Sequence, residues 1–395
     1  MASGYFTSSY KEDMQIFRTI WIRTWMVILF VILAILPFFL KSHLIYLLNI
    51  TGITIIAALG MNLITGFTGQ VSLANAAFMG IGAYTSAILG NLGVPFWICL
   101  FSGGLLAAII SIVVAVPSLR LRGLYLIMST MAFEVIIEYI FMEWETLTNG
   151  VTGIVIQQPR LGGFVFNTDL SMYYMILFFV ILGIATATNI IRTKPGRAFI
   201  AIRDHDVAAK IIGINLTKYK VMAFFISSFY VGVAGGLYAY VVNRIDPEQF
   251  NMMGSIEYLI IIIIGGMGSI TGTIFGSVFM VILPEFIRYI LELNDVLRNF
   301  ISVYFFDVKA AVFGLMIIIF LLGEPGGLVA LWGKIKKYFR NVHSISLLLY
   351  FIRFFCVLCG LVFIYSDSCI FTFLRYTTCH QTWPSWCGRL PARQW

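Results

Sequence analysis

A few polar side chains stand inside long apolar stretches of this chain, where charge and unpaired hydrogen-bonding groups are costly. Glu134 and Glu138 are spaced four residues apart, so they fall on one face of a helix. A charge near the centre of a bilayer costs about 2.5–3.5 kcal/mol, so such residues usually face a cavity or a partner helix. We therefore predict that Glu134 lines a translocation path or anchors one helix to another. Glu138 can lie near the membrane–water interface, where a charge costs little.

A second polar group follows the apolar run that ends near residue 64. Its members combine amides, hydroxyls and glycines: Asn62, Thr65, Gly66, Gly69, Gln70, Ser72 and Asn75. Two glycines in four residues do not easily continue a regular helix, and a broken helix is tolerated in a membrane only against protein or a water-filled cavity. We expect a helix break on a translocation path here. The alternative is close interhelical packing, with small residues and amides bonding across helices.

The longest polar stretch, residues 192–220, is strongly basic. From residue 194 onward only two aspartates oppose its cations, which are Lys194, Arg197, Arg203, Lys210, Lys218 and Lys220. Pro195 suits the first turn of a helix, and Gly213 can close that helix or break it in two. Apolar side chains that a loop in water does not need are interspersed: Phe199, Ile202, Val207, Ile211 and Ile214. We predict a helix that docks onto a partner protein; the alternative is a basic loop that only fixes orientation in a membrane.

Motifs for enzymatic chemistry are missing from the sequence. It contains no phosphate-binding loop of the form G-x-x-x-x-G-K-[ST] and no H-E-x-x-H metal motif, and its four histidines are scattered. We predict no catalytic residue, no metal site and no cofactor bound by this chain. The net charge of +8 does not indicate nucleic-acid binding, because the basic residues lie at the ends of apolar runs.

The elements that position these residues are apolar helices. The 395 residues are 60% hydrophobic and only 11% charged. In lipid the backbone must satisfy its own hydrogen bonds, and the alternation typical of a barrel strand is missing, so we predict an all-α, polytopic membrane protein of about ten transmembrane helices. The predicted spans are 24–40, 44–64, 71–89, 96–117, 123–141, 171–191, 221–242, 256–264, 273–290 and a tenth that ends near residue 322.

The distribution of charge assigns the span ends to two sides of the membrane. Cytoplasmic loops are enriched in Lys and Arg, and with ten spans all the strong basic clusters fall on the same side as the N-terminus: Arg120 and Arg122, the 192–220 segment, and Lys334, Lys336, Lys337 and Arg340. We therefore predict a cytoplasmic N-terminus at 1–23 and a membrane domain at 24–340. The acidic loops, with Glu143, Glu145, Asp246 and Glu248, fall outside.

The stretch 341–395 differs in composition from the rest of the chain. It holds five of the six cysteines. Residues 346–365 are apolar enough for an eleventh span, although Arg353 lies inside it at a cost. The C-x-x-C that begins at Cys356 fits no closed zinc pattern. We predict an atypical tail without a function of its own.

Two glycine-rich stretches echo each other. Residues 60–66 read G-M-N-L-I-T-G and residues 266–272 read G-M-G-S-I-T-G. Glycine-interrupted segments in the two halves of a transporter can mark a substrate path. Because the predicted topology puts both stretches at cytoplasmic ends of spans, we interpret the second as a tight turn rather than a substrate site.

Several of these stretches resemble one family of membrane proteins. The motifs are G-R-A-F-I-A-I-R-D-x-D-x-A-A-x-x-x-G-I from Gly196, G-M-N-L-I-T-G-F-T-G-Q-V-S-L-A-N-A-A-F from Gly60, L-R-L-R-G-x-Y from Leu119, and I-x-I-I-G-G-M-G-S from Ile261. They resemble permease subunits of branched-chain amino-acid ABC transporters, in particular the M type. The T-N-G-V-T-G-I from Thr148 is similar to an outer loop of that family and departs from it at Asn149 and Val151.

The resemblance implies a transport machine of several chains in a bacterial or archaeal cytoplasmic (inner) membrane. A second, different permease subunit would form a heterodimer with this chain, two ATPase subunits would use ATP below it, and a soluble extracytoplasmic binding protein would dock above. The implied cargo is leucine, isoleucine and valine, although relatives with similar motifs move urea or short amides. The implied ATPase-coupling residues are Gly196, Arg197, Ala198, Arg203, Asp204, Ala208, Ala209 and Gly213.

Two other classes of function remain open at this stage. A secondary transporter or channel that needs no ATP could use Glu134 and Glu138 to carry protons or line a pore. A membrane receptor or scaffold would transport nothing. An ATPase that purifies with the chain favours the importer, and uptake by the chain alone favours the secondary transporter.

Overall fold

The structure is a computed structural model, and it describes residues 24, 28, 31–118, 121, 123–161, 164–165, 168–292, 310–320, 322–323 and 326–342. The chain divides into two compact units, 1–332 and 333–395. The predicted N-terminus at 1–23 and residues 343–395 of the predicted tail lie outside the described residues. In the second unit the structure describes only residues 333–342, which complete helix α15 (Gly327–Val342).

Apolar helices dominate the first unit, as the hydropathy pattern predicts. Among the residues that the structure describes, six helical stretches are long and apolar enough to cross a membrane. They are α3 (Ser42–Met61) with its π-helical end η2 (Asn62–Gly66), α5 (Phe96–Ser118), α6 (Leu124–Glu143), α8 (Asp169–Arg192), α11 (Leu216–Val242) and α13 (Ile270–Glu292). The prediction of a helical, polytopic membrane protein is confirmed, and the count of ten spans stays a prediction.

Shorter helices and helical turns connect or flank the long ones along the chain. They are α4 (Asn75–Asn91), α12 (Met252–Gly265), a helix at 310–320, the short α7 (Glu145–Thr148), and the 3-10 turns η1 (Leu36–Phe38), η3 (Gly150–Thr152) and η4 (Pro247–Phe250). At 1.5 Å per residue, the 14 residues of α12 reach only about 21 Å, less than the roughly 30 Å of a hydrocarbon core. α4 begins four residues later than the predicted span 71–89, because residues 67–74 form a turn.

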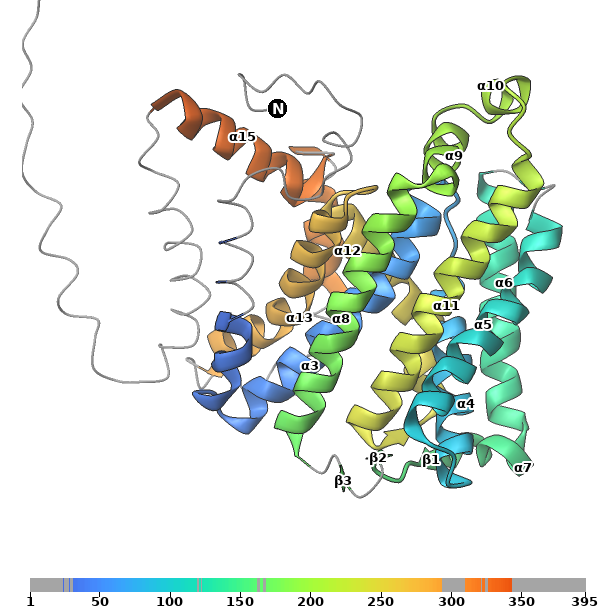
Figure 1. The fold of residues 1–395 in the computed structure, drawn as a ribbon, viewed down its shortest axis with the longest axis vertical. Coiled ribbons are helices and arrows are strands. Elements are labelled where there is room, and N and C mark those ends of the chain that lie inside the picture. Colours follow the sequence, from blue (N-terminus) through green and yellow to red (C-terminus); the bar gives the residue numbers. More distant parts are fainter. Residues whose placement is uncertain are drawn as a thin grey trace, which may run out of the picture. The chain divides into compact units, whose positions relative to one another are not determined.

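Helix α11 forms the centre of the bundle and packs against α3, α4 and α5 (Figure 1). Small residues let these helices approach closely, as in many membrane bundles. A Cβ built on Gly82 of α4 would collide with the Gly232 carbonyl of α11, and one on Gly235 of α11 would collide with the Met79 carbonyl. The backbone of α11 therefore lies directly against that of α4.

Two small antiparallel pairings lie in the first unit. β1 (Ile154–Val155) pairs with β4 (Arg244–Ile245), with Ile154 opposite Ile245, and β2 (Arg160–Leu161) pairs with β3 (Phe164–Val165). β1 and β4 lie at one end of the long helices, and the segment between α8 and α11 lies at the other (Figure 1). We call these ends the β1–β4 end and the α9–α10 end.

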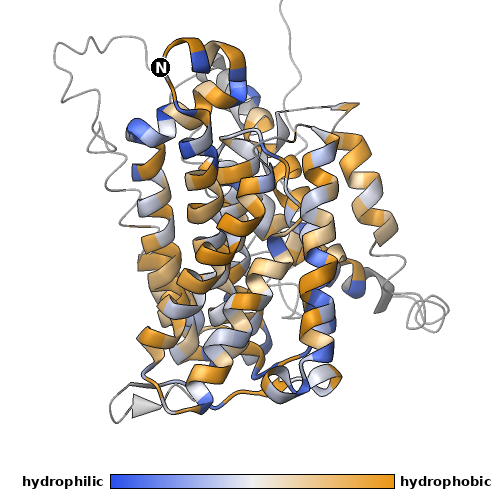
Figure 2. Cartoon of the chain, turned by 90° about the vertical axis from the view of Figure 1, so that its right-hand side faces the viewer, coloured by the Kyte–Doolittle hydropathy of each residue, from blue (hydrophilic) through white to orange (hydrophobic). Residues whose placement is uncertain are grey.

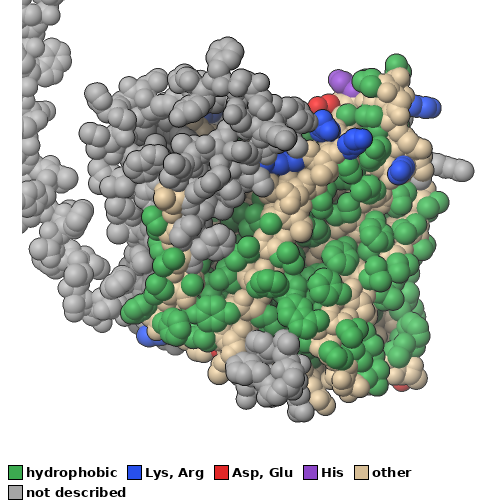
Figure 3. Space-filling model, in the orientation of Figure 1, with side chains coloured by type: hydrophobic (Ala, Val, Ile, Leu, Met, Phe, Trp, Pro, Cys, Tyr) green, Lys and Arg blue, Asp and Glu red, His purple; other side chains and the backbone are tan. Residues whose placement is uncertain are grey.

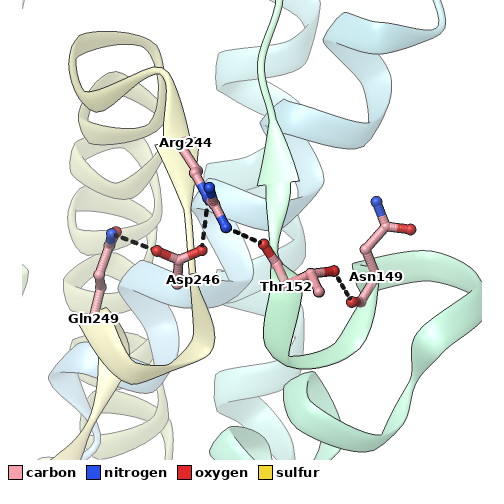
Figure 4. A network of polar contacts seen from close by, with 5 residues as sticks. All are labelled: Asn149, Thr152, Arg244, Asp246 and Gln249. Atoms are coloured by element: carbon pink, nitrogen blue, oxygen red, sulfur yellow. Dashed lines mark hydrogen bonds and ion pairs between the residues drawn. The ribbon is translucent and has the colours of Figure 1, made fainter.

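A polar network fastens the loops at the β1–β4 end (Figure 4). Arg244 donates to the Thr152 carbonyl at 2.9 Å and to the Asp246 carboxylate at 3.2 Å, and Gln249 donates to the same carboxylate at 3.4 Å. Asn149 has a φ of 57°, a left-handed conformation that Asn tolerates better than most residues. The loop after α7 is thus tied to the turn after α11.

The surface of the first unit has the polarity expected of a membrane protein. Hydrophilic residues gather near the helix ends, and the lengths of the helices are hydrophobic (Figure 2). Large apolar side chains face outward along α5 and α6, among them Val113 at 70% and Met128 at 63% exposed. In the view of Figure 3, Lys and Arg side chains collect at the α9–α10 end above an apolar flank.

The close contact of α4 with α11 leads to a stability prediction. Gly82→Ala should lower the melting temperature of the purified protein in detergent, because its methyl group would overlap the Gly232 backbone, and overpacking typically costs about 1–3 kcal/mol. Gly314→Ala is the matched control, since a Cβ there meets nothing within 4 Å. Equal melting temperatures for the two variants would contradict the packing described here.

Candidate functional site

The basic segment folds into two short helices between α8 and α11. α9 (Lys194–Asp204) has its proline in the first turn, as predicted, and α10 (Asp206–Ile211) ends just before Gly213, whose φ is 91°. The chain bends at His205, which is extended at φ −156° and ψ 104°. Of the two roles expected for Gly213, the structure shows the first: it follows the end of α10, and the segment is divided instead at the Asp-His-Asp sequence. Asp206 then stands in the first turn of α10, where a carboxylate complements the helix dipole.

The two helices present their apolar residues in opposite ways. α9 buries Gly196, Ala198, Phe199 and Ile202, and Phe199 is completely buried. In α10 only Ala209 is buried. A patch on and just after α10 is exposed, and we call it the docking patch: Val207 (63%), Ala208, Ile211 (81%) and Ile212 (78%). Arg197, Arg203, Asp204, Lys210 and Gly213 are also exposed. α9 is thus seated on the body, and α10 offers apolar surface outward.

A partly buried ion pair joins α10 to α11. Lys220 of α11 donates to the Asp206 carboxylate at 3.0 Å, and the side chains of Lys220 and Asp206 are 11% and 23% exposed. Removing Asp206 would take this carboxylate from a largely buried ammonium, which is unfavourable. The pair therefore connects α10 to α11.

Arg203 connects α9 with the end of the broken helix. Its Nη1 donates to the Gly66 carbonyl at 3.2 Å, and its guanidinium also pairs with Asp204 at 3.2 Å. A Cβ on Gly69 would lie 3.0 Å from the Arg203 Cγ, so the arginine lies directly on this turn. The carbonyls at the end of a helix lack partners and carry partial negative charge, which a cation satisfies.

The predicted helix break is present between α3 and α4. α3 widens into the π-helix η2, and the chain then turns through residues 67–74 before α4 begins. Hydrogen bonds within the turn hold it together. The Thr68 hydroxyl donates to the Leu63 carbonyl at 2.9 Å, and the Thr65 hydroxyl donates to the Gln70 carbonyl at 3.2 Å. The Gln70 backbone N–H donates to the Ile64 carbonyl at 3.1 Å. Ser72 accepts from the Ala74 amide at 3.4 Å. The break is thus an ordered turn.

Asn62 ties this break to the second glycine-rich stretch. Its Oδ1 accepts from the Gly268 amide at 2.9 Å, and its Nδ2 donates to the Ser269 carbonyl at 3.1 Å and to the Thr273 Oγ1 at 2.8 Å. We call these four residues the Asn62 clamp. The prediction of a tight turn at 266–272 agrees with positive φ at Gly266 and Gly268.

Glu134 completes the other side of the break, at the first turn of α4. The α4 N-cap residue, Ala74, has no side chain that can cap. Glu134 accepts from the Ala77 amide at 2.9 Å and from the Ser255 hydroxyl at 3.3 Å, and Ser255 accepts from the Ala76 amide at 2.8 Å. The carboxylate is fully buried, so the structure favours the interhelical anchor over the lining of an open path.

The structure brings the predicted path residues together in two places. Asn62, Gly66 and Gly69 lie at the Arg203 side of the break, while Asn75 and Glu134 lie at the α4 side, with Thr65, Gln70 and Ser72 in the turn itself. Among the described residues, Gln70 Nε2, Asn75 Nδ2 and Glu134 Oε1 are buried without a protein partner. A surface depression of about 440 Å³ lies at the β1–β4 end, away from these residues. It is lined by Met142, Glu145, Asn149, Gly150, Val151 and Thr152.

Several residues of the site were not predicted. Ser255, Thr130 and the clamp partners Ser269 and Thr273 all bond to the break, and Lys220 holds α10. Thr130, which accepts from the Leu73 amide at 3.0 Å, lies four residues before Glu134, a spacing that could have indicated it. The repeated G-M-x-x-I-T-G pattern marked the two stretches that the clamp joins, although it did not predict the hydrogen bonds between them.

The capping of α4 yields a second stability prediction. Glu134→Ala should lower the melting temperature in detergent, because it leaves the buried Ala77 amide unpaired, at about 1–3 kcal/mol. Glu134→Gln should lose less, since its amide oxygen still accepts from Ala77. Glu138→Gln, one turn along the same helix and only partly buried, is the control and should melt like the parent protein. If Glu134→Ala melts like Glu138→Gln, the capping role is wrong.

The sequence is similar to that of known membrane transport proteins. Residues 43–321 match the family described as branched-chain amino acid transport system, permease component. The chain is 31% identical over 291 residues to the high-affinity branched-chain amino acid transport system permease protein LivM of Salmonella typhimurium, and equally to LivM of Escherichia coli, covering 67% of this chain and 68% of each relative. It is 24% identical to a probable LivH of Methanocaldococcus jannaschii over 73% of this chain and 92% of that protein. No solved structure matches the chain significantly. The chain therefore belongs to the family of permease components of branched-chain amino acid transport systems.

Proposed function

We propose that the chain is a transmembrane permease subunit of a binding-protein-dependent ABC importer for leucine, isoleucine and valine. Its family membership and its similarity to the LivM and LivH permease proteins of branched-chain amino acid transport support both the transport system and the cargo. Urea or short amides are the alternative cargo. As a member of a permease family, the chain is a transport subunit rather than an enzyme.

One observation supports the proposal: at one end of the bundle, α9 is seated on the membrane body while the adjoining α10 exposes apolar side chains. Ile211 and Ile212 are about four-fifths exposed, and an apolar patch rimmed by polar residues is typical of a protein interface. The same segment touches the helix break through Arg203. A surface with these two contacts suits an ATPase that must move the membrane body.

The remaining parts of the machine follow from this assignment. The basic α9–α10 end faces the cytoplasm, in keeping with the enrichment of Lys and Arg on that side, and so does the N-terminus. Two ATPase subunits bind there and hydrolyse ATP, while this chain binds no cofactor. A second permease subunit completes a heterodimer in the inner membrane, and a soluble binding protein docks at the β1–β4 end.

The chain's own residues suggest how force enters the membrane body. Closure of the ATPases displaces the docking patch, and the Asp206–Lys220 pair prevents α10 from swinging independently of α11. The displacement also reaches α9, which transmits it to the membrane body through its buried Phe199 and Ile202. Arg203 then moves relative to the Gly66 carbonyl. The helix break lies where such a displacement reaches the membrane-spanning helices.

Reconstitution tests the function. The chain would be expressed with its partners, purified by a tag on this chain, and placed in liposomes with the binding protein and labelled leucine. Two results support the proposal. The ATPase co-purifies with this chain, and leucine uptake requires ATP on the side of the liposome membrane where the ATPase subunits lie. Uptake by the chain alone without ATP would instead indicate a secondary transporter, and competition by urea or acetamide but not by isoleucine would reassign the cargo.

The docking patch gives a sharper prediction. Ile211→Glu should reduce co-purification of the ATPase and ATP-driven leucine uptake by at least about tenfold, because a buried isoleucine contributes roughly 1.5–3 kcal/mol and about 1.4 kcal/mol is a factor of ten. Leu92→Glu is the control: Leu92 is 73% exposed at the end of α4, near the β1–β4 end. Undiminished ATPase capture by Ile211→Glu would exclude this patch as the contact.

A further inference from the structure

We propose that Asn62 is a positioning residue that transmits the movement of α9 to the α12–α13 turn. This inference rests on the proposed function, because it assumes that an ATPase moves α9. It goes beyond that function by naming the path from the coupling segment into the membrane body. The path runs from Arg203 through the π-helix η2 and Asn62 to the second glycine-rich turn.

The first step of the path is the contact between α9 and both glycine turns. Arg203 donates to the Gly66 carbonyl at 3.2 Å. A Cβ on Gly268 would lie only 2.7 Å from the Arg203 Nη1, so the same guanidinium lies against the second turn as well. One side chain of α9 therefore touches the end of α3 and the start of the turn before α13.

The second step is the Asn62 clamp. Asn62 is 1% exposed and directs its carboxamide oxygen and nitrogen into the second turn, with bonds of 2.9, 3.1 and 2.8 Å to Gly268, Ser269 and Thr273. These bonds join residues more than 200 positions apart in the sequence. A buried amide with both ends bonded fixes relative position and register, because displacement leaves its polar atoms unpaired inside the protein.

The third step is the absence of slack between the two turns. A Cβ on Gly66 would collide with the Asn62 Oδ1 and would lie 2.5 Å from the Gly268 amide nitrogen. Close-packed interiors transmit displacement instead of absorbing it. Asn62 also stands in a π-helical turn, and such turns are frequent at functional sites. A shift of η2 must therefore carry the α12–α13 turn with it or break the clamp.

Position between two sites does not by itself demonstrate coupling, so the test measures coupling in the complete transporter. The reconstituted complex with leucine-loaded binding protein is assayed for ATP hydrolysis and leucine uptake, and the number of ATP molecules hydrolysed per leucine is compared. Asn62→Ala should raise this ratio at least about fivefold, the lower end of typical coupling effects. ATPase co-purification should be unchanged, because Asn62 is 1% exposed and is not part of the docking patch that the ATPase would contact.

Asn49→Ala is the matched control. Asn49 lies on the same helix, is also 1% exposed, and donates its Nδ2 to the Asp169 carbonyl at 3.2 Å near the opposite end. It should leave the ratio within about twofold of the parent. Thr273→Val removes one partner of the clamp while keeping the side-chain shape, so it tests the path if Asn62→Ala fails to assemble; it should raise the ratio as well, by less.

The outcomes separate the two proposals. An unchanged ratio in Asn62→Ala, or in Thr273→Val where Asn62→Ala does not assemble, overturns the transmission role while the importer stands. An equal rise in Asn49→Ala overturns it too, because the effect would then be general loosening of α3. A parent complex that captures no ATPase or takes up leucine without ATP overturns the proposed function itself.

Discussion

The need to pair backbone groups where one helix stops inside the bundle governs the arrangement of this protein. α3 ends in η2 and α4 begins nine residues after Gly66. The break leaves the carbonyls of one helix and the amides of another without helical partners, and buried backbone groups need partners from elsewhere in the protein. The turn satisfies part of this demand itself, through Thr65 and Thr68. The rest is met by side chains from three other helices: Arg203 of α9, Glu134 of α6 and Ser255 of α12.

The side chains at the break match the backbone groups left open there. Arg203, a donor, stands at the carbonyl end of α3–η2, and Glu134, an acceptor, stands at the amide end of α4. Each supplies the hydrogen-bonding partner that the local backbone lacks. Glu134 is fully buried, and one of its carboxyl oxygens accepts from two donors. The hydrogen bonds that stabilise the break also bring α9 and α6 against it, so elements far apart in the sequence meet there.

Much of this could be predicted from the sequence, and the reason is local. Long apolar runs are read directly as membrane helices, and the two glycines at 66 and 69 with their polar neighbours predict a break because both features act through the nearest few residues. Pro195 likewise marks the start of α9. The partners of the break could not be predicted, since Ser255 and Thr273 become caps only when α12 and α13 pack beside α4 and α3. The division of the basic segment at His205 also depends on packing: α9 turns its apolar face to the body, whereas α10 is held by Lys220 with its apolar residues outward.

The contrast between α9 and α10 bears on why the basic segment is not merely a topological signal. A loop that only fixes orientation needs positive charge and nothing more. This one contains a partly buried ion pair between α10 and α11, whose lysine is 8% exposed and whose hydrogen bond is 3.0 Å long. It also leaves Ile211 and Ile212 in water, which is unfavourable unless another surface covers them. A segment that is bonded to the membrane body on one side and apolar where it faces away has the two surfaces that the proposed contact with an ATPase requires.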